Sequence, residues 1–219
     1  MNEELKKSML KTGTSILGIV CKDGVVMAAD RQVTAGNITI NKNFQKIAKI
    51  NDYLVISWTG GVADAMMLTR LVKAELKLKE LRSKTRPTVK EAAALVGTIS
   101  YNNIRQFSAI PFIAGTLVAG YNEDGTVELY SVEPAGSVTK IEDYDANFSS
   151  GMPYILGLLE RKYNPEMGVE EGIELAIECI KSSSARDVGS GYGIDVFKIT
   201  KDGIEHSIKK KTKQNYIDS

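Results

Sequence analysis

The sequence has few of the residues on which the commonest enzyme mechanisms and metal sites depend. Its 219 residues include one histidine and two cysteines, which cannot build an ordinary zinc site. A Ser-His-Asp or Cys-His pair would have to use His206, but no nucleophile motif accompanies it. No glycine-rich phosphate-binding motif with a following lysine is present either. We therefore expect no metal and no cofactor, and we interpret His206 as a surface residue in an edge strand.

Long apolar runs, a set of disulfides and a large net charge are also missing. Cys21 and Cys179 lie in separate apolar stretches and are too few for a disulfide scaffold. No apolar run approaches the roughly 18 residues of a membrane span, and the polar residues 1–13 lack the apolar core of a signal peptide. The net charge of +1 gives no general attraction to nucleic acid or membrane, and we interpret the lysines at 209–213 as a solvated tail. These absences indicate a cytoplasmic protein with no nucleic-acid or membrane partner.

The hydropathy pattern predicts strands, two helices, strands, two helices and strands, in that order. We expect strands at Ser15–Lys22, Val25–Asp30, Thr39–Ile40, Gln45–Ile50, Tyr53–Trp58, Phe112–Tyr121, Thr126–Val132, Ser137–Ile141, Ile194–Thr200 and Ile204–Ile208. We expect helices from about Met66 to Leu81, from the capping box Thr88-Val89-Lys90-Glu91 to about Arg105, at Pro153–Tyr163 and at Val169–Ser183. Segregated strands and helices favour an α+β fold. A four-layer αββα sandwich, with two stacked antiparallel sheets flanked by helices, would bury this pattern in one domain.

With histidine and metal chemistry set aside, hydroxyl, amine, lysine and carboxylate groups remain. The polar leader ends in Gly13, immediately before a threonine, Thr14, that opens the first predicted strand. From this junction onward the chain resembles the β subunits of archaeal proteasomes, which are N-terminal-nucleophile hydrolases. The resemblance extends to about Ile208, and its carriers are Gly13-Thr14, Ala29-Asp30-Arg31, Lys46, Thr59-Gly60-Gly61, Ser149-Ser150-Gly151 and Arg186-Asp187-Val188-Gly189-Ser190-Gly191. It implies a propeptide at residues 1–13 and a threonine protease domain at residues 14–219.

The chemistry of threonine supports this resemblance. A threonine hydroxyl is a poor nucleophile at neutral pH and needs an adjacent base. If the Gly13–Thr14 bond is cut, Thr14 gains an α-amine with a pKa of about 7.7–8.0, close to working pH. This amine is on the nucleophile's own residue, so the base and the hydroxyl are held together. A glycine before the scissile bond would also tolerate unusual backbone angles during self-cleavage.

The resemblance further implies a lysine–carboxylate pair beside the nucleophile. Lys46 would lower the pKa of nearby groups through its positive charge, and Asp30 would fix its position. Without the resemblance, Lys46 is an edge lysine whose stem lies along apolar surface, and Asp30 is a carboxylate that ends a strand. Gly60 would offer its backbone N–H to the developing oxyanion, although it could equally mark the entry to a helix.

Four more positions have roles only through the resemblance. Ser150, Asp187 and Ser190 would form hydrogen bonds around the Thr14 amine, and Thr34 would pair its backbone with the substrate strand. In the absence of that resemblance, serine and aspartate in glycine-rich loops are typical of turns.

The pocket for the residue before the scissile bond is also predicted from the resemblance. Its wall would consist of Val33, Phe44, Ala48, Trp58, Val62 and Met66. All six are apolar, so an unpaired charge buried there would cost several kcal/mol. We expect cleavage after small or medium apolar residues, with Trp58 either at the pocket floor or in the core between sheet and helix.

As in that family, the implied partners are proteasome α subunits, other β subunits in stacked seven-membered rings, a regulatory ATPase that acts indirectly, and unfolded polypeptides as substrates. The helices near 66–81 and 153–163 would provide contact surfaces. Two alternatives remain: a non-catalytic or unprocessed structural β subunit, and an amidohydrolase with an N-terminal nucleophile acting on small amides. The chain departs from the family at Ser15, Ile16 and Gln32, where close relatives often have threonines and a second basic residue.

Overall fold

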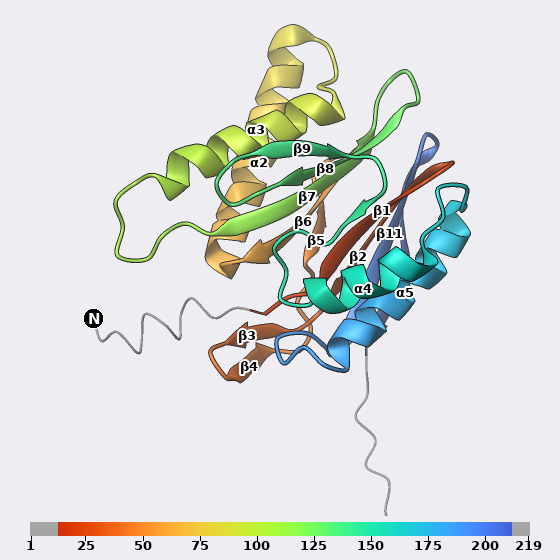
Figure 1. Ribbon diagram of the computed structural model, residues 1–219. Coiled ribbons are helices and arrows are strands. Elements are labelled where there is room, and N and C mark those ends of the chain that lie inside the picture. The colour runs from red at the N-terminus through yellow and green to blue at the C-terminus, as the bar shows by residue number, and fades with distance from the viewer. Residues whose placement is uncertain (1–12, 212–219) are drawn as a thin grey trace, which may run out of the picture.

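The computed structural model describes residues 13–211, and most of the predicted propeptide, residues 1–12, lies outside this range. The described chain forms the expected α+β sandwich, in which two antiparallel sheets stack against each other (Figure 1). One helix pair covers the outer face of each sheet. The predicted fold class is therefore confirmed.

The first sheet has the strand order β10-β1-β2-β11-β12. Its strands are β1 (Ile16–Cys21), β2 (Gly24–Asp30), β10 (Tyr144–Asp145), β11 (Gly193–Thr200) and β12 (Gly203–Lys211). The predicted turn between the first two strands pairs Cys21 with Gly24. Because β2 is the central strand, every one of its residues is buried.

The second sheet has the order β5-β6-β7-β8-β9. Its strands are β5 (Ile47–Lys49), β6 (Leu54–Gly60), β7 (Ala114–Tyr121), β8 (Val127–Val132) and β9 (Val138–Ile141). A separate two-stranded hairpin, β3 (Val33–Ala35) with β4 (Ile38–Asn41), follows the end of β2. In Figure 1 this hairpin projects from one end of the sandwich.

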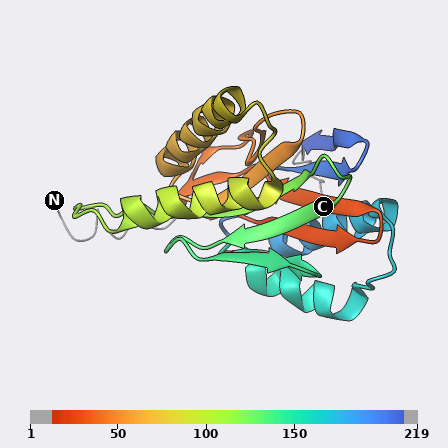
Figure 2. The same cartoon turned by 90° about the horizontal axis from the view of Figure 1, so that it is seen from above.

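The helices within residues 13–211 are α2 (Val62–Ser83), α3 (Val89–Ile104), α4 (Met152–Lys162) and α5 (Val169–Ser184). The predicted capping box is present at the start of α3, where Thr88 Oγ1 accepts from Glu91 N–H at 3.2 Å and Glu91 Oε2 accepts from Thr88 N–H at 2.9 Å. Helices α2 and α3 pack on the second sheet, whereas α5 packs on β1, β2 and β11. Seen from above, the two helix pairs lie on opposite sides of the sheets (Figure 2).

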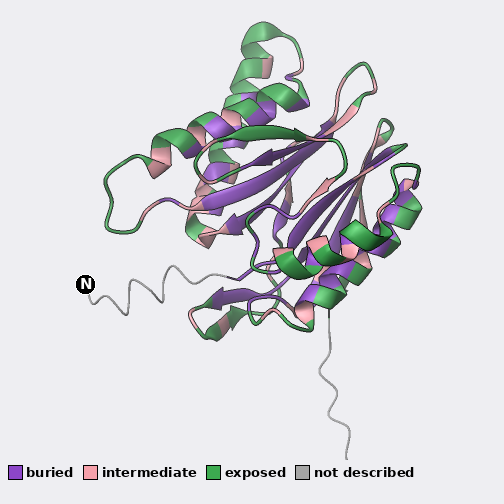
Figure 3. Cartoon of the chain, in the orientation of Figure 1, coloured by how far each residue is buried: buried purple, intermediate pink, exposed green. Residues whose placement is uncertain are grey.

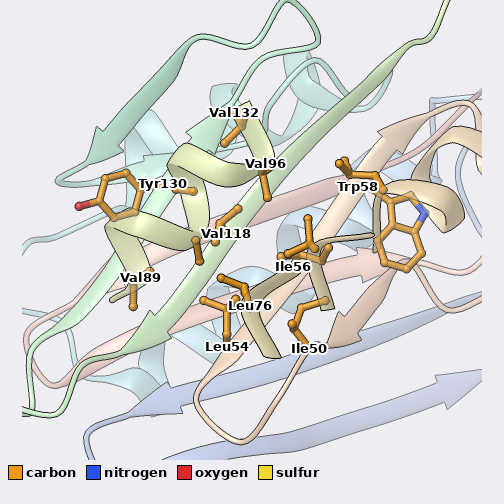
Figure 4. Packing of buried hydrophobic residues seen from close by; sticks show 14 of the residues in the cluster. Ile50, Leu54, Ile56, Trp58, Leu76, Val89, Val96, Val118, Tyr130 and Val132 are labelled. Carbon is orange, nitrogen blue, oxygen red and sulfur yellow. The ribbon is translucent and has the colours of Figure 1, made fainter. Parts of the chain in front are cut away.

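Three apolar clusters hold these layers together, and Figure 3 shows that burial is greatest along the strands. One lies between the two sheets and includes Met27, Leu117 and Phe197. The others lie between each sheet and its helices. Trp58 belongs to the cluster beneath α2 and α3, at one edge of it (Figure 4).

The structure differs from the sequence predictions at several places. Strand β3 and the two-residue β10 were not predicted, and β12 continues to Lys211, so the lysines at 209–211 form a paired strand end rather than a tail. His206 is not simply a surface residue. Its side chain is 27% exposed, stacks on the Phe197 ring at 4.2 Å, and lies 3.0 Å from Asp195 Oδ1.

Candidate active site

Residues from six segments meet at one end of the sandwich. Thr14 lies two residues before the start of β1, and Asp30 is the last residue of β2. Lys46 immediately precedes β5, so it lies just outside this strand, whereas the sequence predicted it inside a strand at Gln45–Ile50. Gly60 ends β6, and the loops at 147–151 and 185–192 complete the site. The polar residues therefore belong to strand ends and loops, while the sheets beneath them are apolar.

The centre of the site is a buried ion pair. Lys46 Nζ lies 2.6 Å from Asp30 Oδ1, and the two side chains are 3% and 0% exposed. Asp30 also accepts hydrogen bonds from three backbone N–H groups, those of Ser15 at 2.8 Å, Gln32 at 2.8 Å and Gly191 at 3.0 Å. These donors come from three separate segments, so Asp30 fixes both the lysine and the surrounding backbone.

The predicted nucleophile lies against this pair. Thr14 is 5% exposed, and its Oγ1 is 3.1 Å from Lys46 Nζ. The same hydroxyl donates a hydrogen bond to the Gly13 carbonyl oxygen at 2.6 Å, and Lys46 Nζ reaches that oxygen at 3.3 Å. Burial lowers the pKa of the Lys46 ammonium below its ordinary value of 10.5, against the opposing charge of Asp30. A hydroxyl beside such an amine has a partner for proton transfer.

A second set of hydrogen bonds surrounds the backbone nitrogen of Thr14. Ser150 Oγ accepts from Thr14 N–H at 2.9 Å and lies 2.6 Å from Asp187 Oδ2. Ser190 Oγ donates to the same carboxylate oxygen. Thus Ser150 contacts the nitrogen that cleavage would convert into an amine, and Asp187 links Ser150 to Ser190.

Three residues that the sequence arguments left out of the site, Ser15, Ser183 and Gln32, form further hydrogen bonds around it. Ser15 Oγ is 2.7 Å from both Ser190 Oγ and Ser183 Oγ, and Ser183, in α5, is fully buried. Gln32 Nε2 donates to Thr34 Oγ1 and to the Val188 carbonyl oxygen, each at 2.8 Å. Two of the positions where this chain departs from its family, Ser15 and Gln32, therefore form specific hydrogen bonds at the site.

A further buried cluster lies behind Asp30. Arg31 Nη1 contacts Asp195 at 2.5 and 2.6 Å, with exposures of 3% and 0%, and Asp195 also faces His206 at 3.0 Å. The Arg31 guanidinium is further held by Asn43 Oδ1 at 2.8 and 3.1 Å. This cluster fixes the residue directly after Asp30.

Gly60 has a backbone conformation that suits glycine. Its φ is +100°, and a Cβ there would lie 2.3 Å from the Ile113 carbonyl oxygen. Both the conformation and the space exclude larger residues. The position is at the wall of a small cavity that also includes Gly13, Thr14 and Lys46.

That cavity, of about 10 Å³, is large enough for about one water molecule. Its wall includes four of the six predicted pocket residues, namely Val33, Phe44, Trp58 and Val62. Thr34 lines it as well. Trp58 is 7% exposed and packs edge-on against Phe44 with ring centres 6.4 Å apart. Trp58 therefore belongs to both the cavity wall and the core.

The remaining two residues of the predicted pocket do not line this cavity. Ala48 faces the cluster beneath α2 and α3, because it alternates with the inward-facing Ile47 in β5. Met66 is 48% exposed on α2. Met66 is exposed because a different face of α2 packs against the second sheet. The buried residues on that face are Ala65, Leu68, Val72 and Leu76.

The described residues contain neither a group of side chains suited to hold a metal ion nor a helix suited to span a membrane. Across residues 13–211, no three or more histidine, cysteine, aspartate or glutamate side chains are grouped to hold a metal ion. None of the helices in this range is both long and apolar enough to cross a membrane.

Comparison with known proteins decides the family. A model of the proteasome subunit family matches residues 10–199. The chain belongs to the proteasome subunit family. It is 43% identical to the proteasome subunit beta of Nanoarchaeum equitans over 192 residues, which are 88% of this chain and 95% of that protein. It is 42% identical to the proteasome subunit beta of Archaeoglobus profundus over 191 residues, 87% and 86% of the two chains.

A third relative, proteasome subunit beta 2 of Pyrococcus abyssi, is 42% identical over 191 residues, 87% of this chain and 88% of that protein. These matches cover almost all of the sandwich and include every segment of the site. The expected resemblance to archaeal-type β subunits is therefore confirmed.

Proposed function

We propose that this chain is a catalytic β subunit of a proteasome core particle and a threonine endopeptidase. The observation that carries this proposal is the contact between Thr14 Oγ1 and Lys46 Nζ at 3.1 Å, with Lys46 held by the fully buried Asp30. A structural subunit would have no need of a buried lysine beside a hydroxyl at the start of β1. Burying such a pair costs free energy unless all its hydrogen bonds are made.

Self-cleavage is the first step of the proposed function. Thr14 Oγ attacks the Gly13 carbonyl carbon, the bond to the Thr14 nitrogen breaks, and the hydroxyl proton passes to that nitrogen through Lys46. Water then hydrolyses the resulting ester, which releases residues 1–13 and restores the hydroxyl. The freed α-amine lies among Ser150, Asp187 and Ser190.

Peptide hydrolysis uses the same atoms. The α-amine accepts the proton of Thr14 Oγ as it attacks a substrate carbonyl, and the Gly60 N–H stabilises the tetrahedral oxygen. The tetrahedral intermediate collapses, the peptide C–N bond breaks, and the α-ammonium returns the proton to the leaving amine. Water then hydrolyses the acyl-enzyme, which releases the acid and restores the Thr14 hydroxyl. Thr34 pairs with the substrate backbone, and the apolar wall beside Trp58 receives small or medium apolar side chains. The particle is cytoplasmic, with α subunits, stacked β rings and a regulatory ATPase that supplies unfolded chains.

The test is co-expression of the full chain with α subunits of an archaeal relative, followed by intact-mass measurement and a peptide-cleavage assay. We expect a chain that begins at Thr14. Thr14→Ala should remain full length and lose at least about a hundredfold of the activity. An active particle whose chain stays full length would refute the mechanism, and a processed wild type without activity would favour a structural role.

A further inference from the structure

The residue before the scissile bond packs directly against a glycine of the 185–192 loop. A Cβ added to Gly13 would lie 2.1 Å from Gly189 Cα and 2.7 Å from the Gly189 carbonyl oxygen. A Cβ added to Gly189 would lie 2.3 Å from Gly13 Cα. Ordinary contacts of a Cβ begin near 3.4 Å. A single methyl group on either residue therefore requires the two backbones to separate by about 1 Å.

Backbone conformation does not explain why residue 189 is glycine. Seven glycines in the described chain have a positive φ that disfavours other residues, and Gly189 is not among them. Alanine could adopt the backbone angles of this position. The restriction at Gly189 is therefore one of space.

Neither side of the contact can withdraw without breaking other bonds. Gly189 N–H donates to Asp187 Oδ1 at 3.1 Å, and the neighbouring Val188 carbonyl accepts from Gln32 Nε2 at 2.8 Å. On the opposite side, the Gly13 carbonyl oxygen is bonded to Thr14 Oγ1 and Lys46 Nζ. A methyl group between them would therefore displace the scissile carbonyl, the loop that carries Asp187, or both.

We propose that Gly189 is a positioning residue for removal of the leader: its bare Cα forms the surface against which Gly13 presents its carbonyl to Thr14. This inference rests on the self-cleavage proposed above. Displacement of a reacting group by about 1 Å slows a reaction on the order of a hundredfold. Once Gly13 has left, the same methyl group needs a much smaller adjustment, because its next contact, Ser150 Oγ at 3.2 Å, has to move by only a few tenths of an ångström. Gly189 therefore acts mainly on processing, whereas Lys46 acts on both reactions.

The experiment follows leader removal in the full chain assembled with α subunits, by intact mass over time. We expect Gly189→Ala to process at least about a hundredfold more slowly than wild type. Gly168→Ala is the matched control, since a Cβ at Gly168, just before α5, meets only side-chain atoms of Lys22 and Asp23 at 3.8 Å or more. It should process at the wild-type rate. The same Gly189→Ala change in a chain that begins at Thr14 should retain peptide cleavage within about tenfold of its unsubstituted counterpart.

The outcomes separate this inference from the function on which it rests. If the wild type is never processed, the proposed function fails. If the wild type and Gly189→Ala are processed at the same rate, only the role of Gly189 is refuted. An equal loss of peptide cleavage in the chain that begins at Thr14 would also refute it, because Gly189 would then act in turnover. If Gly189→Ala does not assemble, Gly13→Ala tests the same contact from the leader side, and wild-type processing of that variant would overturn the inference.

Discussion

Removing one partner of the buried Asp30–Lys46 pair should strongly destabilise the fold, and single and double variants can separate the sources of that cost. Asp30→Asn replaces one carboxylate oxygen by an NH2 group. One oxygen accepts from Ser15 N–H and Lys46 Nζ, the other from Gln32 N–H and Gly191 N–H. Either orientation of the amide therefore leaves two buried donors facing a donor. Loss of one partner of a buried ion pair costs about 3–5 kcal/mol, which is a large fraction of the 5–15 kcal/mol of a typical domain.

Lys46→Met should cost less. It leaves the Asp30 carboxylate with its three backbone N–H donors and removes one charged hydrogen bond, worth about 1.5–3 kcal/mol. The double variant Asp30→Asn/Lys46→Met should be less destabilised than the sum of the two single changes, by about 0.5–3 kcal/mol. The reason is that the second change removes the ammonium that the first leaves unpaired.

The assay is equilibrium urea unfolding of the full chain without α subunits, at one fixed protein concentration, followed by circular dichroism. Asp30→Asn should lower the midpoint by about 1–2 M with little change in slope. Asp202→Asn, in the exposed β11–β12 turn, removes the same charge and should change stability by less than about 0.5 kcal/mol. Strictly additive single and double variants, or an Asp30→Asn variant as stable as the Asp202 control, would refute the reasoning.

Three further predictions concern single groups. Burial lowers the pKa of Lys46 from 10.5 in the folded chain. At pH values between that lowered pKa and 10.5, Lys46 is therefore protonated in the unfolded chain and neutral in the folded chain. The free energy of unfolding should rise with pH in this window by up to about 1.4 kcal/mol per pH unit, and an equal slope in Lys46→Met would contradict this. Trp58→Gly should extend cleavage to sites after Phe and Tyr on a fluorogenic peptide panel, whereas an unchanged profile would leave Trp58 with a core role only. Burial raises the thiol pKa of Cys21 and Cys179 to about 12, so a thiol reagent at pH 8 should label neither in the native chain and both after unfolding; rapid native labelling would contradict the burial.

Features that depend on local sequence were predicted well. The capping box at Thr88 needs only four consecutive residues, and it is present with both hydrogen bonds. The segregation of strands and helices into separate blocks likewise predicted the layers, because each segment must bury one apolar face. Strand β10 has only two residues, Tyr144 and Asp145, and owes its existence to pairing with β1. No pattern within two residues could reveal it.

The orientation of α2 shows where sequence patterns become ambiguous. Met66, Leu71, Leu78 and Leu81 recur at helical spacing, yet all four are at least 40% exposed. A second apolar set, with Ala65 and Leu76 at its ends, faces the sheet instead. Both sets satisfy the helical period, so the face of α2 that is buried depends on the direction in which the helix leaves Gly61. Met66 belongs to the exposed set, which is why it does not line the cavity beside Thr14.

The site itself could be predicted in composition but not in geometry. Family resemblance supplied Thr14, Asp30 and Lys46, whereas their contacts require the ends of β2 and β5, which belong to different sheets, to meet at one end of the sandwich. No sequence pattern predicts the hydrogen bonds of Ser15 and Ser183, because a serine beside a strand or within a helix usually has no specific structural role. The network depends on the fold, which brings the Ser15 and Ser183 hydroxyls to within 2.7 Å of each other.

The same geometry determines which substitutions can separate self-cleavage from peptide hydrolysis. In the proposed mechanism both reactions use Thr14 Oγ and Lys46 Nζ, and Gly13 occupies the cavity wall beside them before cleavage. Any change in Asp30 or Lys46 must therefore impair both reactions, and an unprocessed particle would say nothing about turnover. Gly189 differs because its contact is with Gly13, which is absent after the first reaction. A variant at this position is thus the one that can hold the chain as a precursor while leaving the groups needed for turnover in place.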